Sequence, residues 1–177
     1  MRIGEASHPG PRSRKLRNLD QHVSVWTCNT QGPKQSWTLQ QLLQTQEQAP
    51  QIVLLQECSF SQAEWTTFQK TCWSVGYRSF FSGAQSTVNR HYGGAAVLVK
   101  SSLPCRPAWS HTHKGGSAQA VWVGSTLVIS TYLAPNSDAE TVSAAVAQTV
   151  HSLAPRHRFI LGGITMPHPK RIPFFIS

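Results

Sequence analysis

Acidic residues are scarce in this chain: seven Asp and Glu stand against sixteen Lys and Arg in 177 residues, giving a net charge of +9. Cysteine is also sparse, and its four positions, 28, 58, 72 and 105, form no Cys-x-x-Cys pair. Such spacing argues against a zinc site and indicates small buried side chains. No apolar run reaches membrane-spanning length, and no apolar segment after the first Met predicts a secretory signal. We therefore expect an intracellular protein, with the nucleus as one candidate compartment.

The positive charge is concentrated towards the two ends of the chain. Residues 1–20 contain five basic and two acidic side chains, whereas residues 156–177 contain four basic and no acidic ones. Such segments attract polyanions without forming a specific site, so they predict either a DNA-attracting surface or two solubilising tails. We divide the chain into a flexible basic lead-in (1–20), one domain (21–163) and a divergent basic tail (164–177). The sequence does not indicate an oligomeric state.

One carboxylate, that of Glu57, has an unusual setting. It follows the apolar run Ile52–Leu55, which is typical of a strand buried on both faces. A carboxylate at the end of a buried strand is costly unless it is paired or binds a metal ion. The alternative is a glutamate that simply reaches solvent. Glu64 and Glu140 instead fit capping boxes at helix N-termini, which leaves Glu57 as the acid best placed for chemistry.

Periodicity and turn residues predict an alternation of strands and helices. The expected strands are 22–28, 51–56, 77–81, 94–100, 119–123, 126–132 and 157–162, and the expected helices are 36–46, 61–74 and 137–153. Residues 111–116, which include His111 and His113, are expected to form a loop. This order predicts an α/β fold with helices packed on sheets.

Five segments, in this order, resemble the endonuclease/exonuclease/phosphatase family, which includes abasic-site endonucleases, pancreatic-type DNases and non-LTR retrotransposon endonucleases. They are a strand ending at Asn29, then PQIVLLQE (50–57), GGAAVLV (93–99), YLAPN (132–136) and LGG (161–163). Each motif is weak alone, and their order and spacing carry the resemblance. It implies two packed β-sheets flanked by helices in a four-layer sandwich.

The resemblance also implies chemistry on a nucleic acid, with DNA as the expected partner. Members of the family hydrolyse phosphate esters with Mg²⁺, and Glu57 matches the carboxylate that binds the metal ion. Asn29 matches a catalytic amide that orients the site or the phosphate. Tyr132 matches a side chain near the phosphate. Because the loop after it is one residue longer than the shortest family form, Tyr132 could instead be a strand residue packed on the surface. If Tyr132 is buried in the core away from Asn29, an alternative register applies and Leu133 takes its place.

The chain departs from the family where the attacking water is activated. Ile164 and Met166 stand where the family has the Asp and Asn of Gly-Asp-Phe-Asn, and no Ser-Asp-His motif is present. His168, in the divergent tail, has no neighbouring Asp to orient it. The sequence thus resembles the first two-thirds of such a domain, incomplete at its C-terminus. Three functions stay open: a truncated, retroelement-type endonuclease, a non-catalytic remnant or nucleic-acid-binding module, and an unrelated α/β domain.

Overall fold

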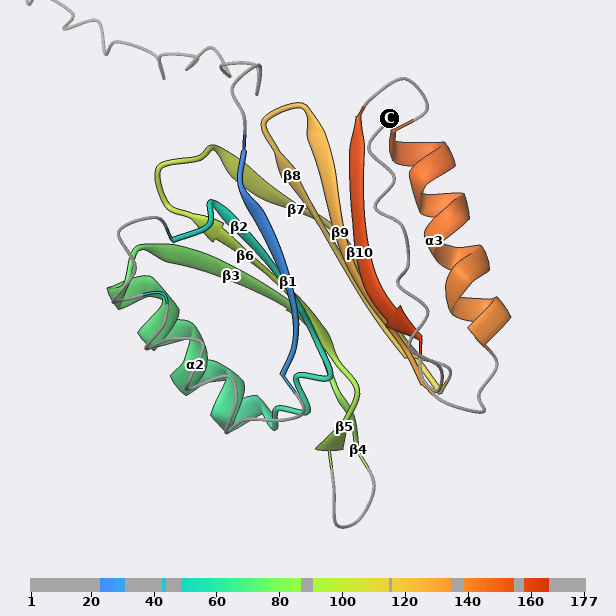
Figure 1. Cartoon of the computed structure of the whole chain (residues 1–177). Helices are drawn as coiled ribbons and strands as arrows, with labels where there is room; N and C mark the ends of the chain where they lie inside the picture. Colours follow the sequence, from blue (N-terminus) through green and yellow to red (C-terminus); the bar gives the residue numbers. More distant parts are fainter. Residues whose placement is uncertain are drawn as a thin grey trace, which may run out of the picture.

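The computed structural model describes residues 23–30, 43, 49–86, 91–114, 116–134, 139–154 and 158–165. Two four-stranded sheets pack face to face between two helices, with α2 outside one sheet and α3 outside the other (Figure 1). The strands are β1 (Val25–Asn29), β2 (Ile52–Gln56), β3 (Tyr77–Ser82), β4 (Gln85–Ser86), β5 (His91–Tyr92), β6 (Ala95–Lys100), β7 (Cys105–His113), β8 (Gly116–Val123), β9 (Thr126–Leu133) and β10 (Phe159–Thr165), and the helices are α2 (Gln62–Ser74) and α3 (Ala139–Leu153). The predicted sandwich is confirmed.

The first sheet has the strand order β1-β2-β6-β3. Strands β1 and β2 are parallel neighbours, as predicted, and both β2 and β3 pair antiparallel with β6. All five residues of β2 are buried. Their hydrophobic side chains alternate between the two faces: Ile52 and Leu54 face the second sheet, while Val53 and Leu55 pack under α2. Burial on both faces explains why this strand is a continuous apolar run.

The second sheet has the strand order β10-β9-β8-β7. Strands β7, β8 and β9 form an antiparallel meander, and β10 returns parallel to β9 after the crossover through α3. Aliphatic side chains fill the space between the sheets, mostly β-branched residues such as Val97, Val121 and Val128. Within the described part of the chain, β1 and β10 are edge strands of their sheets, and they lie on the same side of the sandwich (Figure 1).

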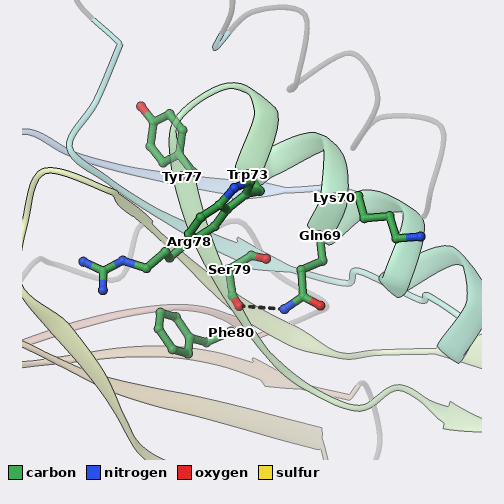
Figure 2. Close-up of a pocket in the computed structure, with 7 residues that line it drawn as sticks. All are labelled: Gln69, Lys70, Trp73, Tyr77, Arg78, Ser79 and Phe80. Atoms are coloured by element: carbon green, nitrogen blue, oxygen red, sulfur yellow. Dashed lines mark hydrogen bonds between the residues drawn. The ribbon is translucent and has the colours of Figure 1, made fainter.

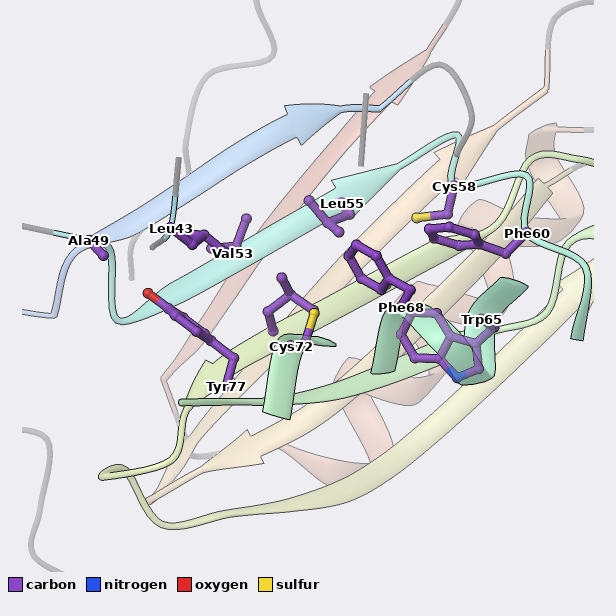
Figure 3. Packing of buried hydrophobic residues seen from close by; sticks show 12 residues of the cluster. Leu43, Ala49, Val53, Leu55, Cys58, Phe60, Trp65, Phe68, Cys72 and Tyr77 are labelled. Carbon is purple, nitrogen blue, oxygen red and sulfur yellow. The ribbon is translucent and has the colours of Figure 1, made fainter. Parts of the chain in front are cut away.

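The core under α2 is aromatic. The rings of Phe60, Trp65 and Phe68 pack on one another (Figure 3). Phe60 and Trp65 also pack on Phe81, and the centroid separations of these five ring pairs are 4.6–6.0 Å. Helix α2 begins at the predicted capping box, in which Ser61 Oγ accepts from Glu64 N and the Glu64 carboxylate accepts from Ser61 N. The cap fixes where the helix starts, and therefore which of its side chains reach the sheet.

The structure corrects several predicted boundaries. Residues 105–113 form the long strand β7, so the loop assigned to His111 and His113 is wrong for these two residues. The pattern was missed because β7 is an edge strand, rich in polar residues and interrupted by Pro107 at a bulge. Strand β8 begins earlier than predicted, β10 ends later, and β4 and β5 were not predicted.

Some predictions lie outside the described residues. These are the lead-in 1–20, the first two residues of the helix predicted over 137–153, and most of the helix predicted over 36–46, of which Leu43 alone is described, as helical and buried. No helix in the described part is long and apolar enough to span a membrane.

Candidate functional site

The ends of β1 and β2 bring two of the predicted site residues together. Asn29, the last residue of β1, lies opposite Gln56 in the parallel ladder, and Glu57 follows Gln56 directly. Both Asn29 and Glu57 are half-buried. Parallel neighbours end at the same edge of a sheet, so the amide and the carboxylate belong to one rim of the sandwich. We refer to this edge, formed by Asn29, Glu57 and the strand ends beside them, as the rim.

The backbone at Glu57 adopts a conformation that non-glycine residues rarely occupy. Its φ is +54°, in the left-handed region, and Ser59 has a φ of +46°. The turn is pinned by hydrogen bonds from Cys58 N to Gly94 O (3.3 Å) and from Ser59 N to Gly93 O (2.7 Å). A non-glycine residue keeps this backbone conformation only where the surrounding contacts enforce it, and such residues concentrate at functional sites. The turn sets the direction in which Glu57 leaves the strand.

A buried polar network holds this turn in place, and the sequence did not predict it. Gln56 is fully buried, its Oε1 accepts from Thr27 Oγ1 (3.2 Å), and its Nε2 donates to Ser130 Oγ (3.1 Å). Ser130 Oγ in turn donates to Leu55 O (2.8 Å). Thr30 Oγ1 completes the network by sharing its single O–H between Gln56 O (3.0 Å) and Glu57 O (3.1 Å). The network joins β1, β2 and β9 directly beneath the rim.

Tyr132 lies on the face of β9 that looks toward the first sheet. It is 7% exposed and shares this face with Val128 and Ser130, whereas Leu133 packs toward α3. A Cβ atom on Gly93 would lie only 2.9 Å from Tyr132 Cε1, so the ring packs directly on the Gly93 backbone. Since Gly93 also binds the turn after Glu57, Tyr132 is part of the same rim. Asn136, predicted behind it, lies outside the described residues.

Strand β10 brings the divergent motif to the rim. A Cβ on Gly162 would meet the Leu54 side chain at 2.5 Å, so β10 passes closely over β2 at this point. Gly162 therefore lets the two sheets approach one another. Two residues later, Ile164 pairs with Tyr132 in the parallel ladder. The position that carries Asp in the family thus lies next to Tyr132, and here it holds isoleucine. Met166 and His168 lie outside the described residues.

The rim offers few ligands for a metal ion. Among the described residues, no three His, Cys, Asp or Glu side chains form a group that could hold one. Mg²⁺ nevertheless needs only one or two carboxylates, because it keeps several waters and binds substrate phosphate oxygens. The half-buried Glu57 carboxylate, with the Asn29 amide oxygen on the adjacent strand end, fits that limited requirement. The donor set is therefore compatible with weak Mg²⁺ binding.

The nearby thiols do not add to the chemistry of the rim. Burial raises the pKa of Cys58 well above its ordinary value, and a smaller opposing effect comes from its hydrogen bond with Thr30. Burial also raises the pKa of Cys28. Thiols in this state remain protonated at neutral pH, so they act as packing residues rather than as nucleophiles or metal ligands.

A cavity of about 460 Å³ lies away from the rim, between α2 and the edge strand β3. It is lined by Gln69, Lys70, Trp73, Tyr77, Arg78, Ser79 and Phe80. Figure 2 shows the side chains of Arg78 and Lys70 extending in opposite directions, and the Arg78 guanidinium donates to the carbonyls of Ser101 and Leu103. These bonds tie down the loop after β6. The cavity contains none of the predicted site residues.

Comparison with known proteins supports the fold. No known family's sequence profile matches the chain, and no curated protein is similar to it in sequence. Similar solved structures include the 3′ phosphatase NExo from Neisseria bound to a product DNA hairpin (TM-score 0.56, 20% identity, 79% of this chain and 55% of that one). Another is the endonuclease domain of TRAS1, a telomere-specific non-LTR retrotransposon (TM-score 0.54, 16% identity, 80% and 58%).

An endonuclease/exonuclease/phosphatase family protein from Leptotrichia buccalis is also similar (TM-score 0.54, 11% identity), covering 80% of this chain and 66% of that one. The chain spans little more than half the length of the NExo and TRAS1 structures. Structural similarity at sequence identities this low shows the fold alone and does not show which reaction the chain catalyses. The chain has the fold of the endonuclease/exonuclease/phosphatase family.

Proposed function

We propose that this chain is a Mg²⁺-dependent endonuclease-like phosphodiesterase domain for nucleic acid, of retroelement type, that lacks turnover in its present form. The observation that carries the proposal is the meeting of Asn29, the turn at Glu57 and Tyr132 at one rim. Solved proteins of this fold include one bound to a DNA hairpin and one from a retrotransposon, which supports a nucleic-acid substrate. An intracellular location, including the nucleus, accords with this proposal.

Each rim residue has a distinct role in the proposal. Glu57 would hold Mg²⁺, and a bound Mg²⁺ would supply Lewis-acid polarisation of the phosphate and charge stabilisation of the leaving oxygen. The Asn29 amide lies on the adjacent strand end and orients the carboxylate or a phosphate oxygen. The Tyr132 hydroxyl donates to the phosphate from the opposite sheet. Gln56 and Ser130 act as positioning residues, because their buried hydrogen bonds fix the strand from which Glu57 emerges.

The proposal of inactivity rests on two side chains. Ile164 cannot accept a proton from water, and Met166 cannot donate a hydrogen bond to phosphate. These positions match the Asp and Asn that carry out those steps in the family, and the 177 residues contain no Ser-Asp-His motif. General acid–base catalysis contributes roughly two to four orders of magnitude in rate. Its loss together with phosphate positioning leaves little measurable turnover.

The alternative proposal is a non-catalytic nucleic-acid-binding module with the same fold. It is favoured by the chain's net charge of +9 and by the basic residues at both of its ends. Contacts between these residues and phosphates would carry no sequence information and would weaken steeply with salt. DNA binding that persists unchanged at high salt would contradict this electrostatic account.

The test is nicking of supercoiled plasmid by the full chain in Mg²⁺, with EDTA and a Glu57→Ala variant as controls. We expect no nicking above the EDTA background and weak, salt-sensitive plasmid binding. Nicking that requires Mg²⁺ and disappears in Glu57→Ala would contradict the proposed lack of turnover and would support Glu57 as the metal-binding residue. Nicking that persists in Glu57→Ala would place the chemistry away from this rim.

A further inference from the structure

A stripe of aromatic and basic side chains runs along the outer face of β7, the edge strand of the second sheet. In the antiparallel ladder between β7 and β8, the residue pairs on this face, with the β7 residue first, are Arg106–Trp122, Trp109–Ala120, His111–Ala118 and His113–Gly116. Side chains of directly paired residues lie on the same face of a sheet. Trp122, Ala120 and Ala118 belong to the cluster under α3, which identifies this face as the outer one. We refer to Arg106, Trp109, His111 and His113 as the β7 stripe.

The rings of the stripe are stacked in a row. The centroids of Trp109 and His111 are 5.5 Å apart with their planes at 5°, and those of His111 and His113 are 6.2 Å apart at 15°. At the other end, the Arg106 guanidinium carbon lies 5.6 Å from the centre of the Trp122 ring. The partners of the three rings on β8 are alanine or glycine, so the neighbouring strand leaves space for them. The result is an ordered column in which His111 lies between the rings of Trp109 and His113.

The stripe is accessible and carries charge of one sign. Arg106 and His113 are exposed, while Trp109 and His111 are half-buried. Residues 105–114 include no Asp or Glu, and Lys114 follows the strand. His111 Nε2 is buried with no hydrogen-bond partner, and the His111 ring is stacked on both Trp109 and His113. Stacked aromatic rings flanked by cations are the features with which proteins hold single strands: bases stack on rings and phosphates meet the cations.

The stripe also leads to the rim. His113 lies opposite Gly116, which pairs with Leu133 in the next ladder. The Cβ position of Gly116 falls against the carbonyl of Tyr132, so the end of the stripe adjoins the strand end that contributes Tyr132 to the rim. A polymer held along β7 would therefore run toward the rim.

We propose that the β7 stripe binds a single-stranded segment of nucleic acid and guides it toward the rim. This inference rests on the proposed function for its substrate class, but it concerns a different surface and needs no metal ion. A base that stacks on the exposed ring of His113, at the end of the column, gains affinity without sequence preference, since every base has a π face. Arg106 and Lys114, at the two ends of the column, supply the phosphate contacts. Because a duplex conceals its base faces, the stripe is expected to favour single strands.

The experiment uses the full chain with a fluorescently labelled oligo-dT in EDTA, read by fluorescence anisotropy, so that turnover plays no part. We expect His111→Ala/His113→Ala to weaken binding about tenfold, which is the scale of one base–aromatic stack. The matched control is His151→Ala, which removes an exposed histidine from the last turn of α3 and is expected to leave the affinity unchanged. His113→Ala alone, at an exposed position, separates loss of binding from loss of folding.

A second variant separates stacking from charge. His111→Lys/His113→Lys places positive charge at these positions without rings, and we expect it to bind as weakly as the alanine variant. Full affinity in the lysine variant would overturn the stacking claim, and so would an alanine variant that binds as tightly as the wild type. Displacement of the oligonucleotide by poly-glutamate of equal charge would identify a general acidic-partner surface and contradict the proposal. Absence of plasmid nicking bears only on the rim, so the two proposals can fail separately.

Discussion

The two sheets contribute unequally to the rim. The first sheet supplies an amide at Asn29 and a carboxylate at Glu57, supported by a buried network through Gln56. The second supplies Tyr132, but beside it stands Ile164 rather than a side chain that could activate water. The buried network beneath the end of the first sheet contains the side chains of Thr27, Thr30, Gln56 and Ser130. They are linked through the Gln56 amide and the backbone carbonyls of β2 and the turn after it. The polar side chains beneath the rim therefore come mainly from the first sheet, and the second sheet contributes Ser130 to them.

The cores of the two sheets differ as well, and this difference gives the largest expected effect. The cluster under α2 is built from aromatic rings, with Phe68 fully buried among them. Phe68→Ala removes a ring that its neighbours cannot replace, so the free energy of unfolding should fall by about 4 kcal/mol. Urea denaturation followed by far-UV circular dichroism measures this change. A loss below 1 kcal/mol would mean that the packing of α2 on the first sheet does not depend on the Phe68 ring.

The second-largest loss of unfolding free energy is expected when the hydrogen bond between Gln56 in the first sheet and Ser130 in the second is removed. Gln56→Ala removes the acceptor of Thr27 Oγ1 and the donor to Ser130 Oγ, which keeps its bond to Leu55 O, and it opens a cavity between the sheets. We expect a loss of about 3 kcal/mol, which combines the two lost hydrogen bonds with the missing volume. Gln69→Ala is the matched control, because this exposed glutamine makes only a 3.5 Å contact with Ser79 O. Equal losses in the two variants would contradict a special role for the network.

Alkaline pH should destabilise the first sheet through one tyrosine. Burial raises the pKa of Tyr77 from 10.0 to about 12, and its hydroxyl donates to Pro50 O. Because the folded pKa exceeds the unfolded one, the stabilisation is complete below pH 10 and is lost as the pH rises through 12. We expect unfolding free energy to fall by about 2 kcal/mol across that window. A Tyr77→Phe variant should show a flatter profile, and identical profiles would exclude this origin.

The smallest expected effect concerns the start of α2. Ser61→Ala removes the oxygen that accepts from Glu64 N and should cost about 1 kcal/mol of unfolding free energy. Ser74→Ala, at the far end of the same helix, is the control and is expected to change stability much less. Thermal unfolding of the two variants side by side gives the comparison, and a larger loss from Ser74→Ala would reverse the assignment of the cap.

The sequence predicted those features that depend on local pattern. The apolar run in β2, the capping box of α2 and the parallel pairing of β1 with β2 all follow from periodicity and connection length. The sequence did not predict strand β7, because an edge strand need not be apolar on either face. The bond between Gln56 and Ser130 joins residues 74 positions apart, and the left-handed turn at Glu57 carries no glycine to signal it. These features arise from tertiary contacts.

The central claim is that the rim keeps the metal-holding half of the site, and paramagnetic NMR tests it most directly. Mn²⁺ prefers the same oxygen ligands as Mg²⁺ and broadens the resonances of nearby nuclei. In titrations of the ¹⁵N-labelled chain, we expect the amide signals of Thr30 and Gly93 to broaden first, because both residues contact the turn around Glu57. Glu57→Gln should abolish this broadening, whereas Glu64→Gln, a matched change in the capping box, should retain it. Unaltered broadening in Glu57→Gln would contradict the account.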